Sequence, residues 1–251
     1  MHEMVRAQSH PALARLAQCA MRAAPPPDPA SLAVIDASLN AAARALAEDD
    51  DRDAVAAAME SAAEVVKSLG AAAGGARAHF EATHLKALAD HCLAVLEGRA
   101  LCQEGDDEEG GGGGEEDDED DEEAELGQIV LEGCAELLPA IAAVASASSH
   151  HMFQPHFAAL MRRTAASRPE GQRSVSYANL VEVARAIGPA AIPVVPIALP
   201  GCIRELSAET AGLRRNCAYC AGVLVEVGGR CQTKTVSRQV IQHIVNPRVL
   251  Y

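Results

Sequence analysis

The sequence predicts an all-α fold, built as an α-solenoid of about four stacked helix pairs, and two observations on composition and pattern lead to it. Aromatic residues make up only 2% of the 251 residues, and alanine and leucine dominate the apolar 49%. Sheets favour β-branched and aromatic residues, whereas alanine and leucine are strong helix formers. Apolar residues also recur at helical spacing along most of the chain, so that helices can bury one face against each other.

The first half of the chain contains four predicted helices, which follow a break. Residues 1–30 are expected to hold an N-terminal helix and a proline-rich break at Pro25, Pro26 and Pro27. The acids at residues 48–51 suit a helix start, and Gly70 suits a helix end. Apolar stripes predict the four helices over residues 31–47 (Leu32, Ile35, Leu39), 53–69 (Ala58, Ala62, Val65), 76–97 (Phe80, Leu88, Cys92) and 124–144 (Val130, Cys134, Leu137).

The second half contains four more predicted helices. In the third of them, expected over residues 192–206, Pro193 and Pro196 lie where the opening turn of a helix accepts proline. Pro200 inside this helix predicts a kink, and the alternative is that two short helical pieces meet there. The helices are expected over residues 151–163 (Phe153, Phe157, Leu160), 174–187 (Tyr177, Leu180, Ala184), 192–206, and 211–227 (Leu213, Cys217, Leu224).

The helix ends recur with a period of about 40 residues, which is the length of a two-helix HEAT unit of the armadillo type. Four units are expected, at about residues 31–70, 71–148, 149–188 and 189–229, and the second is lengthened by an insertion. Each unit would bury its apolar stripe only by stacking on its neighbours.

The net charge of −14 comes from one segment. Residues 104–125 carry fifteen acidic residues and no basic one, and the remaining 20 acidic residues face 21 basic ones. Because like charges repel, residues 104–123 are expected to form a disordered acidic loop within the array. The loop is either a solvated linker or an anionic segment that attracts basic partners. Its sign opposes direct binding to nucleic acid.

We expect no enzyme, no cofactor and no metal site. Cys217 and Cys220 share the buried stripe of one helix and lack the second close pair of a zinc site, so they are interpreted as core residues. His150, His151 and His156, and His91 beside Cys92, are interpreted as polar residues rather than metal ligands. The glycines at residues 110–114 lack the Lys-Ser/Thr of a phosphate loop.

The composition also predicts where in the cell the protein is found. Residues 1–24 do not read as a signal peptide, and no window of about 18 uninterrupted apolar residues suggests a membrane span. The eight cysteines follow no regular framework, which favours reduced thiols in the cytosol or nucleus.

A set of short motifs follows in a fixed order along residues 31–229. Upstream, Cys102-Gln103 is followed by the acidic run and by Leu137-Leu138-Pro139. Downstream come a proline-kinked helix, an acidic turn at Glu209 and a helix ending in Gly-Gly, with the residues Pro200, Arg214, Asn216, Gly222, Gly228 and Gly229. In this order the motifs resemble those of the importin-β (karyopherin-β) nuclear import receptors, nearest the subgroup of importin four, importin five and karyopherin 123.

The resemblance implies a receptor that moves between cytoplasm and nucleus and binds basic cargo, such as histone-like or ribosomal proteins, through Lys/Arg-rich localisation signals. Cargo binding would be collective, through Asp106, Asp107, Glu108, Glu109, Glu115, Glu116, Asp117, Asp118, Glu119, Asp120, Asp121, Glu122 and Glu123. A second candidate surface is the concave face made by the second helix of each unit, whose polar residues include Glu182, Arg185, Arg214, Arg215 and Glu226. The alternative, favoured for any one of them, is an ordinary solvated residue.

The chain also departs from this family. The N-terminal repeats that bind the Ran GTPase in the family have no counterpart, and residues 230–251 diverge, so the chain is expected to be part of a longer receptor. The alternative is a generic HEAT scaffold or adaptor that has no role in transport.

Overall fold

The protein is helical throughout the part that the computed structural model describes, which is residues 3–23, 28–71, 75–103 and 116–229. No strand occurs among these residues, so the predicted all-α class is confirmed. The break predicted at Pro25–Pro27 and the divergent residues 230–251 lie outside the described residues. The chain divides into two compact units, Met1–Ser146 and Ala147–Tyr251.

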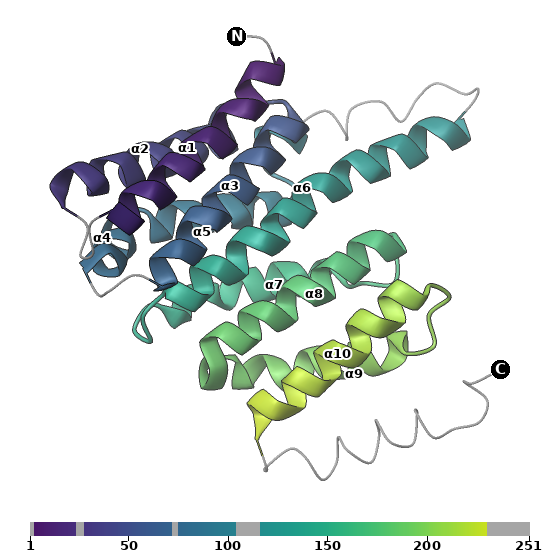
Figure 1. Ribbon diagram of the computed structural model, residues 1–251. Helices are drawn as coiled ribbons and strands as arrows, with labels where there is room; N and C mark the ends of the chain where they lie inside the picture. Colours follow the sequence, from purple (N-terminus) through teal and green to yellow (C-terminus); the bar gives the residue numbers. More distant parts are fainter. Residues whose placement is uncertain (1–2, 24–27, 72–74, 104–115, 230–251) are drawn as a thin grey trace. The chain divides into compact units, whose positions relative to one another are not determined.

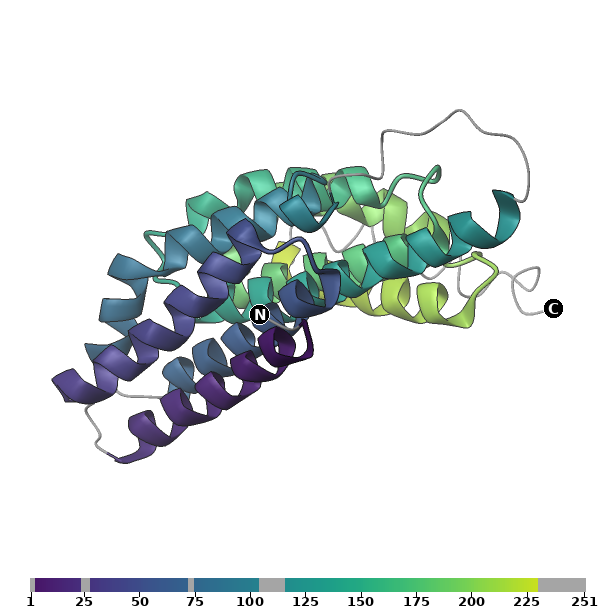
Figure 2. The ribbon, with the colours of Figure 1, turned by 90° about the horizontal axis from the view of Figure 1, so that it is seen from above.

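Unit 1 is organised around α3, which packs against α1, α2 and α6 (Figures 1 and 2). Helix α5 packs against α6 and, less extensively, against α2. The elements of this unit are α1 (Glu3–Ala23), α2 (Pro29–Glu48), α3 (Arg52–Ala71), α4 (Gly75–Thr83), α5 (Leu85–Leu96), the 3-10 helix η1 (Leu101–Gln103) and α6 (Glu116–Val144).

Aspartates cap the starts of α2 and α3. The Oδ1 atom of Asp28 accepts a hydrogen bond from the backbone N–H of Ser31 at 2.7 Å, and that of Asp51 accepts one from the N–H of Ala54 at 3.1 Å. Such caps satisfy N–H groups that have no partner inside the helix. The hydrogen bond from Ser31 is also the main reason that the pKa of Asp28 lies below its usual value. The two predicted helices over residues 31–47 and 53–69 are therefore confirmed, each a little longer than expected.

Two other expectations for unit 1 need correction. The single helix expected over residues 76–97 is two helices, α4 and α5, separated at His84. The helix expected from residue 124 begins at Glu116, so it covers residues 116–123 of the acidic segment, which was expected to be a loop throughout. Glutamate is a good helix former, and negative charge favours the N-terminal end of a helix, which accounts for the earlier start.

The core of unit 1 is densest where α3 meets α6. Gly133 of α6 lies against Met59 of α3, and a Cβ atom on Gly133 would stand only 3.2 Å from the Cβ and Sδ atoms of Met59. The small residue therefore lets the two helices approach closely. The fully buried side chains of the unit include Leu39, Leu69, Phe80, Leu88, Leu131, Leu137, Leu138 and Ile141.

Unit 2 is organised around α10, which packs against α8 and α9, while α7 packs against α8. Its elements are η2 (His150–Phe153), α7 (Gln154–Arg163), α8 (Glu170–Ile187), the 3-10 helix η3 (Gly188–Val194), α9 (Val195–Glu205) and α10 (Ala211–Gly228). The helix expected over residues 192–206 is thus two pieces, which was the alternative to a kink at Pro200. The junction of the pieces lies next to Pro196 rather than at Pro200, because proline is accepted at the first positions of α9.

Two stretches are long and apolar enough to cross a membrane by length and composition alone, Gly127–Val144 and Glu170–Glu205. Neither stretch contains about 18 uninterrupted apolar residues, which is the pattern expected of a membrane span. The first is the part of α6 that packs on α3 and α5, and the second comprises α8, η3 and α9, whose two α-helices both pack on α10. Packing within each unit accounts for their apolar character.

Candidate functional site

The acidic segment is attached at both ends to the core of unit 1. Before it, the Nε atom of Arg52 donates a hydrogen bond to the carbonyl oxygen of Cys102 at 2.9 Å, and Cys102 is buried. After it, Val130 of α6 is buried, and Glu136 of the same helix pairs with Lys67 of α3 at 2.6 Å. The segment is therefore an insertion between two parts of one packed unit.

The predicted cargo-binding residues are placed only in part. Glu116, Asp117, Asp118, Glu119, Asp120, Asp121, Glu122 and Glu123 belong to the first turns of α6, and their side chains lie outside the described part of the chain. Asp106, Asp107, Glu108, Glu109 and Glu115 lie outside the described residues altogether.

The residues that match the family in unit 2 occupy structural positions. The Nη1 atom of Arg214 donates to the carbonyl oxygens of Ala208 and Glu209 at 2.8 and 2.7 Å, which closes the turn before α10. The Nδ2 atom of Asn216 donates to the Oγ atom of Ser174 at 2.9 Å, which ties α10 to α8.

The proline and glycines of the match lie along α9 and α10. Gly229 caps α10 with a φ of 64°, a left-handed conformation that favours glycine. Pro200 and Gly222 are exposed on α9 and α10, and Gly228 is buried. None of these four residues carries a functional group for binding, so they shape the helices rather than form a site.

A buried ion pair joins α8 to α9 inside unit 2, and sequence reasoning missed it. Arg173 donates through Nη1 to the Oε2 atom of Glu205 at 2.5 Å, and the two side chains are 11% and 5% exposed. The other oxygen of Glu205 accepts from the exposed Arg204 at 3.0 Å, and that hydrogen bond is the main reason that the pKa of Arg204 is raised. The pair therefore holds the end of α9 against the first turn of α8.

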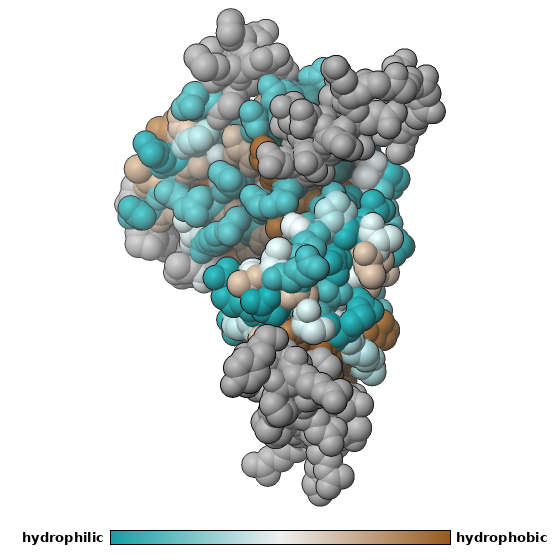
Figure 3. Space-filling model, turned by 90° about the vertical axis from the view of Figure 1, so that its right-hand side faces the viewer, coloured by the Kyte–Doolittle hydropathy of each residue, from teal (hydrophilic) through white to brown (hydrophobic). Residues whose placement is uncertain are grey.

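An exposed polar cluster joins α8 to α10, within the second candidate surface. The hydroxyl of Tyr219 donates to the Oε1 atom of Glu182 at 2.8 Å, and the guanidinium of Arg185 lies over the Tyr219 ring at 5.0 Å. Glu182 and Arg185 are thus both engaged with Tyr219, whereas Arg214 is engaged in the turn before α10. The face drawn in Figure 3 is mostly hydrophilic with scattered hydrophobic residues, which is typical of a solvated surface.

The cysteines predicted to be core residues are buried. Cys217 and Cys220 of α10 are fully buried, as is Cys202 of α9. A hydrogen bond with Cys220, together with burial, raises the pKa of Cys202 far above its usual value, and burial does the same for Cys217. Thiolates are the reactive and metal-binding form, so Cys202 and Cys217, whose pKa is raised, behave as small apolar side chains.

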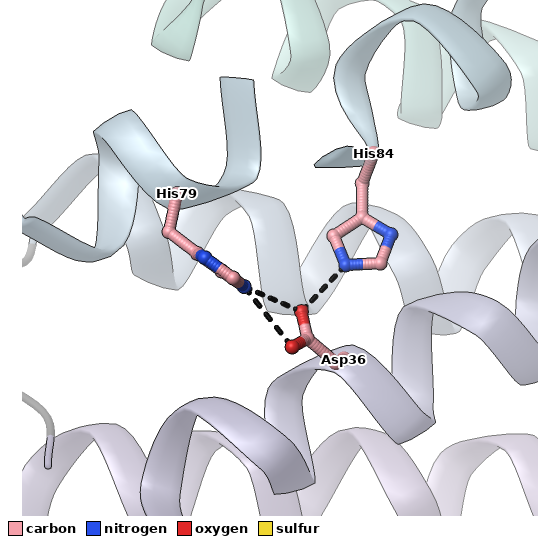
Figure 4. Close-up of side chains that lie close together, drawn as sticks. All are labelled: Asp36, His79 and His84. Atoms are coloured by element: carbon pink, nitrogen blue, oxygen red, sulfur yellow. Dashed lines mark hydrogen bonds and ion pairs between the residues drawn. The ribbon is translucent and has the colours of Figure 1, made fainter. Parts of the chain in front are cut away.

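A cluster that the sequence did not predict lies in unit 1, where Asp36 of α2 meets His79 of α4 and His84 at the α4–α5 break (Figure 4). The Nε2 atom of His79 lies 2.8 and 3.0 Å from the two carboxylate oxygens of Asp36. That of His84 lies 2.6 Å from Oδ1. Burial acts to raise the pKa of Asp36, but the hydrogen bonds from His84 and His79 outweigh it and hold that pKa below its usual value.

The helix break explains why this cluster escaped notice. In one continuous helix, residues five apart do not share a face, since only positions three or four apart are neighbours. The interruption at His84 brings its ring to the same carboxylate as that of His79, and Asp36 lies 43 and 48 residues away in sequence. The only available signal was the pair of histidines close to a helix end.

Two of the histidines considered in the sequence, His151 and His156, have local partners instead. The Nδ1 atom of His151 lies 2.8 Å from the carbonyl oxygen of Ser148, and that of His156 lies 3.2 Å from the carbonyl oxygen of Met152. His91 is half-buried, and burial lowers its pKa against the opposing effect of Asp90. These residues serve the packing and ends of their own helices.

Comparison with known proteins adds no relative: no family model matches the chain, and no curated protein matches it significantly.

Proposed function

We propose that this chain is a HEAT-type helical array that binds basic proteins, as part of an importin-β-like nuclear import receptor. One observation carries the proposal: fifteen acidic residues and no basic residue lie within residues 104–125, while the rest of the chain is nearly neutral. A charge distribution of this kind is a means of attracting a polypeptide of opposite sign.

The order of helix contacts supports the array. In unit 1 the second helices of successive pairs, α3 and α6, contact each other, and α2 and the α4–α5 pair lead into them. In unit 2 the same relation holds between α8 and α10, with α7 and α9 leading into them. We therefore propose that these pairs are the four units expected near residues 31–70, 71–148, 149–188 and 189–229. Helix α1 contacts α3 as a further second helix would.

The attachment of the acidic segment supports its role in binding. The residues on both sides of the segment belong to the packed part of unit 1, so the segment is an insertion within this unit rather than a terminal tail. Attraction between exposed charges is screened over about 8 Å at physiological ionic strength. A basic cargo would therefore associate faster and more tightly at low salt, and no single carboxylate would be decisive.

The test is a full-length variant in which every Asp and Glu within residues 104–125 is replaced by its amide. We expect this variant to bind a Lys/Arg-rich peptide about tenfold more weakly than the unchanged protein, because the long-range attraction is lost. Fluorescence anisotropy with a labelled peptide, at salt from about 50 to about 300 mM, measures both the affinity and its salt dependence. Over this range of salt, the affinity of the unchanged protein for the peptide should fall steeply, and that of the variant should fall only slightly.

The matched control removes exposed acids elsewhere in unit 1, through Glu60→Gln and Asp90→Asn. Both residues lie on helix surfaces away from the acidic segment in sequence, so binding should remain as in the unchanged protein. Equal binding by the amide variant and the unchanged protein contradicts the proposed role of the acidic segment.

The transport role is tested separately with a fluorescent fusion of the chain. If the chain takes part in nuclear import, the fusion should be present in both the cytoplasm and the nucleus.

A further inference from the structure

We propose that Asp36, His79 and His84 form a binding site for a divalent transition-metal ion of the zinc type, which would fasten α2 to the α4–α5 break. The ligand atoms of the three side chains all lie within 4.8 Å of one another. Figure 4 shows both imidazole rings pointing toward the same carboxylate from two different elements. This inference is independent of the proposed cargo binding.

The donor set selects the class of metal. Two imidazole nitrogens and one carboxylate suit zinc and its transition-metal neighbours, whereas magnesium and calcium prefer oxygen donors alone. Three protein ligands leave a fourth position for water in a tetrahedral zinc site. Asp36 and His79 are each about one third exposed, which leaves solvent a path to that position.

Two of the three distances between donor atoms are close to those of a filled site. With zinc-to-ligand distances of about 2.0–2.2 Å, tetrahedral donors stand roughly 3.3 Å apart. The Oδ1 atom of Asp36 now lies 2.6 and 2.8 Å from the two Nε2 atoms. Moving these atoms apart by about 0.5–0.7 Å would admit the ion, and rotation of the partly exposed Asp36 and His79 side chains provides such a movement.

One ligand is held in place by the fold. His84 is 7% exposed, its ring stacks on that of the fully buried Phe80, and its backbone N–H donates to the Phe80 carbonyl oxygen at 2.9 Å. A ligand that packing already orients loses little freedom on binding. On binding, each ring would present an unprotonated Nε2 to the ion and keep its proton on Nδ1, so the hydrogen bonds to Asp36 would be replaced by metal bonds.

The experiment titrates zinc chloride into the full chain by calorimetry, in a reducing agent that does not bind metal. We expect one tight equivalent and, at a hundredfold excess over the dissociation constant, a rise in Tm of about 5–10 °C. His79→Gln should weaken binding at least about tenfold, which at the same zinc concentration reduces the rise in Tm to about half or less. Glutamine keeps an N–H donor for Asp36, so the variant is expected to fold, and circular dichroism without zinc verifies this.

The matched control is His151→Gln, which removes an exposed histidine of unit 2 and should leave zinc binding unchanged. X-ray absorption at the zinc edge gives a readout that needs no variant. Nitrogen and oxygen neighbours alone support the site, whereas a sulfur shell near about 2.3 Å places the ion on cysteines and overturns the proposal. Unchanged affinity in His79→Gln, or the lack of a stoichiometric equivalent in the original protein, overturns it as well.

Discussion

Replacing Arg173 by leucine is expected to lower the free energy of unfolding by about 3 kcal/mol. The substitution leaves Glu205, which is 5% exposed, without the partner that holds one of its oxygens at 2.5 Å. Removing one member of a buried pair is costly because the remaining charge is left desolvated. We place the loss at the low end of the usual range, since the exposed Arg204 still reaches the other oxygen at 3.0 Å. Urea unfolding followed by circular dichroism measures the change.

Two further variants test whether the loss of stability comes from the unpaired charge of Glu205 rather than from the loss of the ion pair itself. The double substitution Arg173→Leu with Glu205→Leu removes both charges and should recover most of the lost stability, because the pair itself contributes little beyond two packed apolar side chains. Lys86→Ala breaks the exposed pair with Asp90 and is expected to cost less than about 0.5 kcal/mol. A double variant as unstable as Arg173→Leu alone would show that the leucine at position 173, rather than the unpaired carboxylate, causes the loss.

Gly201→Ala is expected to destabilise the protein by about 1–2 kcal/mol, although the substitution lies inside a helix, where alanine is normally preferred by about 1 kcal/mol. The reason is steric. A Cβ atom at Gly201 of α9 would stand 2.6 Å from the hydroxyl oxygen of Tyr177, whose side chain is fully buried in α8 and has no room to withdraw. Overpacking of this kind outweighs the gain in helix propensity.

The sign of this effect should reverse in the Tyr177→Phe background. Without the hydroxyl, the nearest ring atom lies 3.7 Å from the new Cβ, which is an ordinary contact. Gly201→Ala should then stabilise the protein by roughly 0.5–1 kcal/mol through helix propensity alone. Thermal unfolding of the four proteins in this cycle measures the coupling. A loss of equal size in both backgrounds would exclude the hydroxyl as its cause.

Helix positions could be predicted from the sequence because burial of a stripe leaves a periodic pattern. Tyr177, Leu180 and Ala184 recur at helical spacing, and all three are fully buried in α8. Start and stop residues refined the boundaries, as with the acids at residues 48–51 before α3 and Gly229 after α10. Cys217 and Cys220 were assigned to the core for the same reason, since their spacing places them on the buried face.

Features that depend on contacts between distant residues could not be predicted in this way. The Arg173–Glu205 pair joins residues 32 apart, and nothing in either local sequence distinguishes them from surface charges. The division of residues 76–97 at His84 also left the apolar pattern almost intact, so periodicity alone did not reveal it. The Asp36–His79–His84 cluster depends on the helix break at His84. Because the break was not predicted, the cluster was not predicted either.

The distribution of cysteines has a consequence for how opening of each unit can be followed. Unit 1 encloses Cys92, Cys102 and Cys134, unit 2 encloses Cys202, Cys217 and Cys220, and Cys19 of α1 is the exposed cysteine among the described residues. Buried thiols react with an alkylating reagent only when the helices around them separate. The rate at which the buried thiols of a unit are alkylated therefore reports on the local unfolding of that unit. Peptide mapping of the modified thiols would measure the two rates separately in one sample.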